Sequence, residues 1–303
     1  MRQASSTSAV QAASHDSAAS NVATYFDARS AYWSDVYGEG SLDGAVYRDR
    51  MGVSLRWIAG LALPAGARVL DVGCGAGLAS VALAARGYRV VAVDIAPGML
   101  ELTRRRAADH GVASRVTTRR ADVAQLADDG GFDLVLGLGL LPWVKDPAAT
   151  VAALGRLVRP GGHLLVTADN RWSLFHALDP GRNPRTRRAA WFAHRAVERL
   201  ISWRGQRGAA AATPPSYRHA PPDVDGWLAA AGLTKVRSVS VGFGPLTFFD
   251  RKVMSREATV RVHERLQALA DRQVPGLRDA GAHYVVLARS DRPAASGSAA
   301  QVG

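Results

Sequence analysis

Short apolar runs alternate along the chain with amphipathic segments, and this alternation predicts its architecture. In the stretch 68–94, apolar runs at 69–72 and 89–93 have the length of strands, and the segment 78–86 between them carries small apolar residues suited to packing on a sheet. Glycines follow the first run, and Gly87 follows the helical segment as a C-terminal cap. The stretch therefore predicts a strand, a glycine turn, a helix and a second strand.

The same alternation continues along the chain. Further strands are expected at 115–118, 132–136, 163–168, 234–241 and 284–288, and further helices at 97–110, 147–158, 223–231 and 254–272. Strands that alternate with helices are typical of an α/β fold with a parallel sheet.

The glycine turn and the acid after the second strand carry the first chemical signal. In an open parallel sheet, a ligand binds beyond the carboxyl ends of the strands, and the backbone approaches it closely only where side chains are missing. Gly73, Gly75 and Gly77 clear that space, and Asp94 is placed to accept hydrogen bonds from the two hydroxyls of a ribose. The pattern indicates a cofactor that contains adenosine; the alternative is a turn that merely joins strand to helix.

The acid ahead of the turn separates two cofactors. A dinucleotide-binding turn has a third glycine where this chain has Leu78, and it faces a pyrophosphate that Asp71 would repel. Asp71 can instead accept a hydrogen bond from the ammonium group of a methionine moiety, directly or through water. The spacing therefore favours S-adenosylmethionine over NAD.

The motif D-x-G-x-G-x-G at Asp71, Gly73, Gly75 and Gly77 resembles the first motif of the class I S-adenosylmethionine-dependent methyltransferases. A helix, an Arg-Pro-Gly-Gly turn and a strand are a second match, and the resemblance covers about residues 65–170. It implies a Rossmann-like, seven-stranded, mostly parallel sheet with helices on both faces and an antiparallel last strand. The Asn-Arg pair after the fifth strand resembles the ubiquinone/menaquinone-biosynthesis methyltransferase group within this class.

The resemblance also implies further cofactor contacts. Ile95 and Met99 would line the adenine pocket, and Asp122 would accept a hydrogen bond from the adenine amino group. Val123 and Leu138 would complete the cofactor pocket. The alternative for Asp122 is the N-cap of a helix.

Aromatic residues mark the region before this core. The pairs at 25–26 and 32–33 are seven residues apart and share one face of a predicted helix. The helix either packs on the core or, as in the family that the chain resembles, closes over the cofactor and acceptor with a Gly-x-Gly hinge at 38–40. In the second case Arg48 or Arg50 could reach the methionine carboxylate.

Charge is concentrated in one segment of the 303 residues. The formal net charge is +12, and residues 169–222 hold ten arginines and three acidic residues, a net +7. Such an excess suits an acidic small molecule, an anionic membrane surface or nucleic acid. Nucleic acid is disfavoured, because the arginines are not interleaved with a stacking platform and no nucleic-acid-binding motif is found. Residues 190–203 predict an amphipathic helix, which is either a packed lid or a peripheral membrane contact.

Cysteine content and hydropathy exclude other classes. Cys74 is the only cysteine, which excludes a disulfide framework and a thiolate metal cluster, and the acids and histidines show no metal-ligand spacing. No apolar run has the length of a membrane span, and the N-terminus lacks the pattern of a signal peptide. We therefore expect a cytoplasmic protein, with membrane contact only at its surface.

We expect one domain between two loose tails. Residues 1–20 form a disordered tail, 21–289 a single methyltransferase domain, and 290–303 a second tail. Within the domain we expect a helical cap, a cofactor-binding core, a basic lid insertion and the C-terminal part of the sheet, at 21–64, 65–168, 169–222 and 223–289.

The predicted reaction is methyl transfer from the sulfonium to a small-molecule acceptor. The acceptor is expected to be the hydroxyl oxygen of a phenolic, quinone-like or other lipophilic metabolite, although the arginines suit an acidic acceptor equally well. Orientation supplies most of the rate, and a base takes the hydroxyl proton. The candidate bases are His176, His194, His219 and Asp169. Two alternatives stay open: an NAD-dependent oxidoreductase, and a non-catalytic S-adenosylmethionine-binding protein associated with a membrane or a partner.

Overall fold

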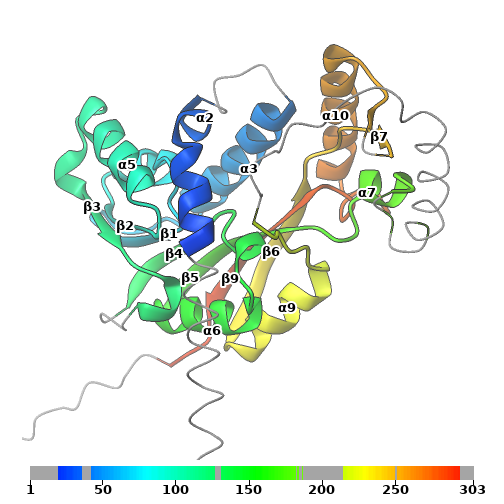
Figure 1. The fold of residues 1–303 in the computed structure, drawn as a ribbon. Coiled ribbons are helices and arrows are strands. Elements are labelled where there is room, and N and C mark those ends of the chain that lie inside the picture. Colours follow the sequence, from blue (N-terminus) through cyan, green and yellow to red (C-terminus); the bar gives the residue numbers. More distant parts are fainter. Residues whose placement is uncertain are drawn as a thin grey trace, which may run out of the picture.

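A computed structural model describes residues 20–35, 42–126, 131–181, 183, 186, 214–249 and 251–293 of the chain. Seven strands form one mixed sheet in the order β3-β2-β1-β4-β5-β9-β6 (Figure 1). They are β1 (Arg68–Val72), β2 (Arg89–Asp94), β3 (Val116–Arg120), β4 (Phe132–Gly137), β5 (Val158–Asp169), β6 (Leu233–Val241) and β9 (His283–Ser290). Strands β1 to β5 are parallel, whereas β9 runs antiparallel to both β5 and β6. This confirms the predicted Rossmann-like sheet with an antiparallel last strand.

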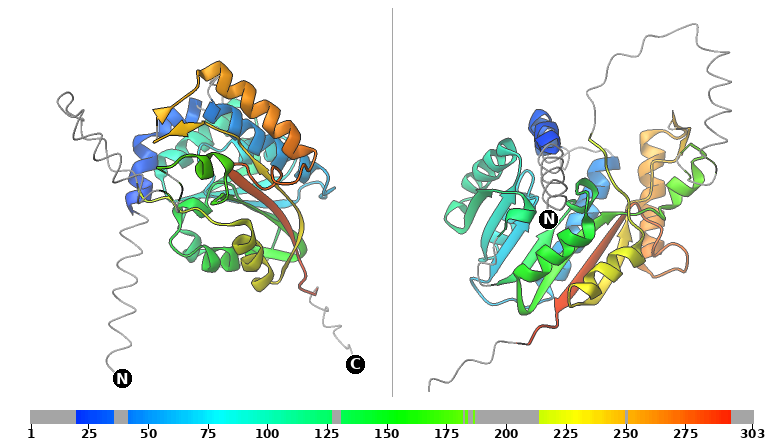
Figure 2. Two further views of the ribbon diagram at one scale, coloured as in Figure 1. Left: turned by 90° about the vertical axis from the view of Figure 1, so that its right-hand side faces the viewer. Right: turned by 60° about the horizontal axis from the view of Figure 1, so that its bottom comes forward.

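Helices lie on both faces of the sheet (Figures 1 and 2). A helix at residues 20–28 comes first. The others are α2 (Ser30–Asp35), α3 (Leu42–Ala59), α4 (Leu78–Ala84), α5 (Pro97–Asp109), α6 (Pro147–Leu157), α7 (Leu174–Leu178), α9 (Pro221–Ala230) and α10 (Arg256–Asp271). Three short 3-10 helices connect them: η1 (Ala113–Arg115), η2 (Val123–Gln125) and η3 (Leu141–Trp143).

Two apolar layers hold the helices to the sheet. On one face, α6 and α9 contribute Leu154 and Leu228 to a core shared with β4, β5 and β9. On the other face, α3 and α4 contribute Ile58 and Leu83. Because both faces of the central strands are covered, their sequences are nearly continuous apolar runs rather than alternating ones.

The Arg-Pro-Gly-Gly segment at 159–162 differs from its prediction as a turn. It lies inside β5 as a bulge, where the pairing with β4 shifts register between Phe132 and Leu134. A Cβ on Gly162 would lie 3.0 Å from the backbone oxygens of Phe132 and Asp133, so only glycine allows this close approach.

The segment 242–246 leads into a two-stranded hairpin of β7 (Thr247–Phe248) and β8 (Arg251–Lys252). The hairpin is held by the fully buried carboxylate of Asp179, which directly follows α7. This carboxylate accepts hydrogen bonds from the backbone N–H of Phe249 at 3.1 Å and from the hydroxyl of Thr247. A contact between residues so distant in sequence leaves no trace in the hydrophobic pattern.

Several predictions fall on residues outside the described ranges. These are the N-terminal tail up to residue 19, the hinge at 38–40, the amphipathic helix at 190–203, His194, and the tail beyond residue 293. Within the described ranges, no helix is both long enough and apolar enough to cross a membrane. The same residues contain no group of three or more His, Cys, Asp or Glu side chains that could hold a metal ion.

A buried histidine ties α10 to α3, and the two helices lie side by side (Figure 2). His263 is 1 % exposed, and its Nδ1 accepts a hydrogen bond from the backbone N–H of Phe243 at 3.0 Å. Its Nε2 lies 3.0 Å from Oδ2 of Asp49 on α3. Because Nδ1 accepts, the proton of the neutral ring is on Nε2 and faces the carboxylate.

Replacing His263 by alanine should lower the free energy of unfolding by about 2–4 kcal/mol, because a buried N–H loses its acceptor and a cavity forms. Urea denaturation followed by tryptophan fluorescence measures this. Glu264→Ala, at the exposed neighbouring position, is the control and should change stability by less than about 0.5 kcal/mol. Equal effects of the two substitutions would contradict the role of His263.

Candidate active site

The glycine turn after β1 folds back onto the end of β2. The backbone N–H groups of Gly73 and Cys74 donate to the carbonyl oxygen of Val93 at 2.8 and 3.0 Å. Gly73, Gly75 and Gly77 have φ values of 70°, 54° and 75°, in the left-handed region that side chains disfavour. The turn therefore needs glycine for its backbone conformation as well as for the space above it.

A cavity of about 420 Å³ lies above this turn, at the carboxyl ends of β1, β2 and β4. Its volume is in the range of small-molecule sites. Nine of the ten residues predicted to bind the cofactor line it: Asp71, Gly73, Gly75, Asp94, Ile95, Met99, Asp122, Val123 and Leu138.

Asp94 holds the turn in place and faces the cavity. Its Oδ2 accepts a hydrogen bond from the N–H of Gly75, and its Oδ1 accepts one from the N–H of Ala96, both at 2.9 Å. Burial raises the pKa of this carboxyl, although the backbone hydrogen bonds oppose the rise. Each oxygen keeps a second lone pair, which a ribose hydroxyl can use.

Asp71 is the more strongly perturbed acid. It is 1 % exposed, and its Oδ2 accepts a hydrogen bond from the hydroxyl of Ser80 at 2.6 Å. Burial raises the pKa of Asp71 to about 6; the hydrogen bond from Ser80 opposes the rise and the charge of Asp94 adds to it. A cationic group bound in the cavity would stabilise the ionised form of Asp71.

Asp122 caps a helix and also lies at the cavity. It caps η2, because its Oδ1 accepts a hydrogen bond from the N–H of Ala124 at 2.8 Å and the side chain of Gln125 reciprocates. It also lines the cavity. The cap positions the carboxylate at the cavity wall, so the two roles are compatible.

Gly77 is the one predicted cofactor residue that does not line the cavity. A Cβ at this position would lie 2.6 Å from Oγ1 of Thr103, which is fully buried on α5. Its glycine therefore serves the close packing of α4 on α5 rather than direct ligand contact.

Aromatic rings form the roof of the cavity. Phe26, from the helix at 20–28, contacts Trp33 and Trp143 with ring centroids 5.6 and 5.1 Å apart, and Trp33 contacts Tyr47 at 5.7 Å. All four rings line the cavity. The predicted single helix is broken by a turn at Arg29, and each half contributes one ring to the cavity, Phe26 from the first and Trp33 from the second. These N-terminal helices thus pack on the core and cover the cavity at the same time.

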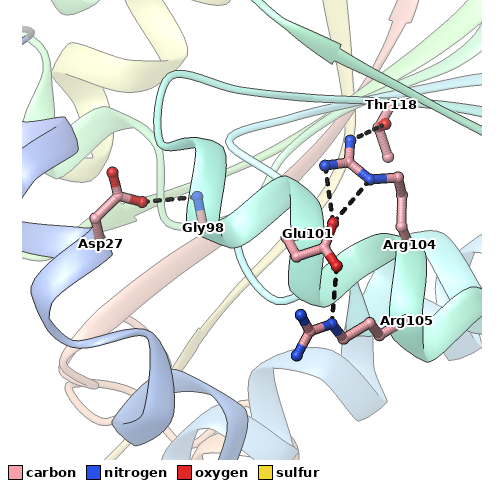
Figure 3. A network of polar contacts seen from close by, with 6 residues as sticks. All are labelled: Asp27, Gly98, Glu101, Arg104, Arg105 and Thr118. Atoms are coloured by element: carbon pink, nitrogen blue, oxygen red, sulfur yellow. Dashed lines mark hydrogen bonds and ion pairs between the residues drawn. The ribbon is translucent and has the colours of Figure 1, made fainter.

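One hydrogen bond fastens this roof to the start of α5 (Figure 3). Oδ1 of Asp27 accepts from the backbone N–H of Gly98, at the start of α5, at 2.8 Å. A carboxylate at this end also complements the dipole of α5. The exposed Glu101 pairs with Arg104 and Arg105 one turn later and belongs to the surface of α5.

The structure separates the candidate bases. Asp169 lines the cavity, and its Oδ1 lies 3.0 Å from Nδ1 of His283, which lines it as well. The ring of His219 instead packs edge-on against Trp227 at 5.1 Å, and burial lowers its pKa. Neither His219 nor His176 on α7 lines the cavity. Of the three predicted bases in the described ranges, only Asp169 is at the site.

Sequence reasoning missed His283, and it left two arginines undecided. His283 is 114 residues from Asp169, and only the antiparallel pairing of β9 with β5 brings them opposite each other. The one available signal was that, in an antiparallel pair, the first residue of the last strand lies beside the final residue of the fifth strand. Of Arg48 and Arg50, Arg50 lines the cavity, where its guanidinium lies 4.8 Å from the ring centre of Tyr47.

Alanine at Gly75 and at Gly77 should have different consequences. Both variants should lose about 1–2 kcal/mol of stability from a left-handed non-glycine residue, and Gly77→Ala should lose a further ~1–3 kcal/mol by overpacking against Thr103. At Gly75 a Cβ meets nothing within 4 Å and projects into open space, so Gly75→Ala should chiefly weaken binding of S-adenosylhomocysteine. Thermal denaturation and calorimetric titration of both variants test this; a larger stability loss for Gly75→Ala would contradict it.

The chain was compared with known proteins. Residues 70–166 match a family model described as a methyltransferase domain. The chain is 40 % identical over 128 residues to a ubiquinone biosynthesis O-methyltransferase of Xanthomonas axonopodis pv. citri, a match that covers 42 % of this chain and 53 % of that protein. It is 37 % identical over 148 residues to the protein of the same name from Alkalilimnicola ehrlichii, covering 48 % and 58 %. The matches thus span about half the length of these curated relatives.

Solved structures share the fold over more of the chain. The magnesium protoporphyrin IX methyltransferase of Synechocystis PCC 6803 with bound SAH has a TM-score of 0.57 and 16 % identity, covering 90 % of this chain and 99 % of that one. A putative sarcosine dimethylglycine methyltransferase from Galdieria sulphuraria has a TM-score of 0.51 and 15 % identity, covering 82 % and 87 %. At these identities the likeness establishes the fold alone. The fold of these structures and the position of the cavity agree with the match of residues 70–166 to the methyltransferase-domain model.

Proposed function

We propose that this chain is an S-adenosylmethionine-dependent methyltransferase that methylates a hydroxyl oxygen of a small phenolic, quinone-like or other lipophilic acceptor. The observation that carries the proposal is that one cavity has two different parts. The glycine turn, Asp71 and Asp94 form the first end of the cavity, and an aromatic roof that includes Trp33 and Trp143 covers the cavity.

The residues at the first end fit the cofactor. Open space above Gly75 would admit the methionine and ribose parts close to the backbone. Asp71 would hold the ammonium group and Asp94 the ribose hydroxyls, while Asp122 and Met99 would border the adenine. Arg50 is the buried cation available for the methionine carboxylate.

The aromatic roof supports an aromatic acceptor. Phe26, Trp33, Tyr47 and Trp143 offer ring faces and edges to a planar molecule. The names of the curated relatives, O-methyltransferases of ubiquinone biosynthesis, are consistent with a phenolic oxygen as the methylated atom. Peripheral membrane contact through 190–203 would suit a lipophilic acceptor, and it stays a prediction, since that segment lies outside the described residues.

For methyl transfer, the main task of the protein would be to position the two reactants. A bound cofactor supplies a methyl group on a sulfonium, which is already a good leaving group. The residues of the cavity would hold the acceptor oxygen in line with that methyl group, and orientation of this kind accounts for most of the acceleration. The roof would exclude water that competes for the site.

The NAD-dependent alternative fits this cavity less well. A pyrophosphate above the turn would meet the buried carboxylate of Asp71, which repels it. The non-catalytic alternative would leave the aromatic part of the cavity without a reacting ligand.

Isothermal titration with S-adenosylmethionine, S-adenosylhomocysteine and NAD tests the proposal. The first two should bind, and Asp94→Ala should weaken both by about 10- to 100-fold, because hydrogen bonds to a charged acceptor are lost. Asp109→Ala, at an exposed acid on α5, is the control and should bind like the unmodified chain. Binding of NAD alone would overturn the proposal, and a thermal melt shows whether Asp94→Ala is folded.

The raised pKa of Asp71 predicts a pH-dependent affinity. An ammonium group needs the ionised carboxylate, and with a pKa of about 6 the free protein increasingly protonates Asp71 as the pH falls. The dissociation constant for S-adenosylhomocysteine should therefore rise about tenfold between pH 7 and pH 5. Because the pKa of Asp94 is raised too, Asp71→Asn separates the two acids and should have a shallower pH dependence. Equal slopes in both proteins would contradict the assignment to Asp71.

A further inference from the structure

A histidine and a carboxylate lie side by side at the carboxyl end of β5, on the acceptor side of the cavity. Strand β5 ends at Asp169 and the antiparallel strand β9 begins at His283, and the two residues are direct partners in the ladder. Strand β5 lies two positions from β1 in the sheet order, on the side away from β2. Strand β9 is one position further, so at about 4.8 Å per strand Asp169 is about 10 Å and His283 about 14 Å along the sheet from the strand that precedes the glycine turn.

The contact between the two side chains fixes the orientation of the imidazole. Nδ1 of His283 lies 3.0 Å from Oδ1 of Asp169. Burial by itself would raise the pKa of Asp169, but the hydrogen bond from His283 and the charges of Arg218 and Arg50 hold it below its usual value. An ionised carboxylate only accepts hydrogen bonds, so Nδ1 carries the proton and Nε2 of the neutral ring has the lone pair.

The lone pair on Nε2 is available to a ligand. Across the part of the chain that the structure describes, Nδ1 is the only ring nitrogen of His283 with a hydrogen bond. The His283 side chain is 16 % exposed and lines the cavity. It is therefore held on one side and open on the other, which is the arrangement that a general base requires.

The neighbouring groups suit a phenolic hydroxyl. The ring of Tyr47 lies 6.2 Å from that of His283, centre to centre. Burial raises the pKa of Tyr47 well above its usual value, so it stays protonated and does not compete as a base. Arg50 lies over the Tyr47 ring, so its positive charge is close to this part of the cavity.

We propose that Nε2 of His283 takes the proton of the acceptor hydroxyl, with Asp169 as the positioning residue that holds the ring. This rests on the proposed function. In the step, the O–H bond of the acceptor breaks and an N–H bond forms at Nε2. The oxygen electron pair forms the new O–CH₃ bond, and the electron pair of the breaking C–S bond stays on sulfur. The imidazolium then returns its proton to water.

The test uses 4-nitrocatechol, whose phenolate absorbs visible light and whose protonated form does not. Absorbance is recorded with the full chain, with and without S-adenosylhomocysteine, at a pH where the free compound is mostly protonated. The phenolate band should appear with the unmodified chain and fall at least tenfold with His283→Gln. His110→Gln, at an exposed histidine on the far end of α5, is the control and should retain the band. No band with the unmodified chain, or its loss in His219→Gln but not in His283→Gln, overturns the proposal.

Asp169 is tested by the pH dependence of the same band. Without the carboxylate, His283 should become a weaker base, so Asp169→Asn should shift the appearance of the band to higher pH, and Asp169→Glu should restore part of the shift. Tyr47 and Arg50 from α3 and Arg218 near α9 also face this pair, and they are unchanged in both variants. An Asp169→Asn profile identical to that of the unmodified chain overturns the positioning role.

Turnover with catechol adds a second readout. His283→Gln should lower kcat by about 10²- to 10⁴-fold with catechol and by less with 4-nitrocatechol, which loses its proton more easily. Titration with S-adenosylhomocysteine separates the two proposals: if the unmodified chain does not bind it, the proposed function fails, while the band without cofactor still tests His283. If His283→Gln binds it normally but keeps full turnover, only the inference fails.

Discussion

The carboxylate of Asp94 joins the elements on which the cavity depends. It accepts one hydrogen bond from the glycine turn after β1 and one from the start of α5, while it stands at the end of β2. A buried charge is costly without partners, and two hydrogen bonds from the backbone offset that cost. The turn, the strand and the helix therefore have one relative position, and the spare lone pairs of Asp94 face the cavity.

The aromatic roof covers the part of the cavity that Asp94 holds together, but other contacts hold the roof in place. Its rings come from the N-terminal helices, from α3 and from the segment after β4, and they contact one another. Two polar contacts position it: Asp27 fastens the first helix to α5, and His263 holds α3 to α10. Rings that cover a cavity keep water out, which strengthens the electrostatic interactions of Asp71 and Asp94 beneath them.

The direction of β9 decides what chemistry lies beside the cavity. A parallel strand in this position would bring its last residue, Ser290, to the edge where β5 ends. Because β9 is antiparallel, its first residue, His283, is there instead and meets Asp169. One reversal of strand direction thus places an imidazole and a carboxylate beside a cavity whose glycine turn follows a parallel strand.

The sequence by itself determined the α/β class, the order of the strands along the chain and the glycine turn that, with Asp71 and Asp94, lines the cavity. These follow from local constraints: apolar periodicity, the backbone conformation that the glycines allow, and the short spacing from Asp71 to Asp94. Only the tertiary structure decided that Gly77 packs against Thr103, that Asp179 holds the β7–β8 hairpin, and that His283 rather than His219 faces the cavity. Periodicity states which face of an element is buried, but not which distant element covers it, so contacts between residues far apart in the sequence appear only when the chain is folded.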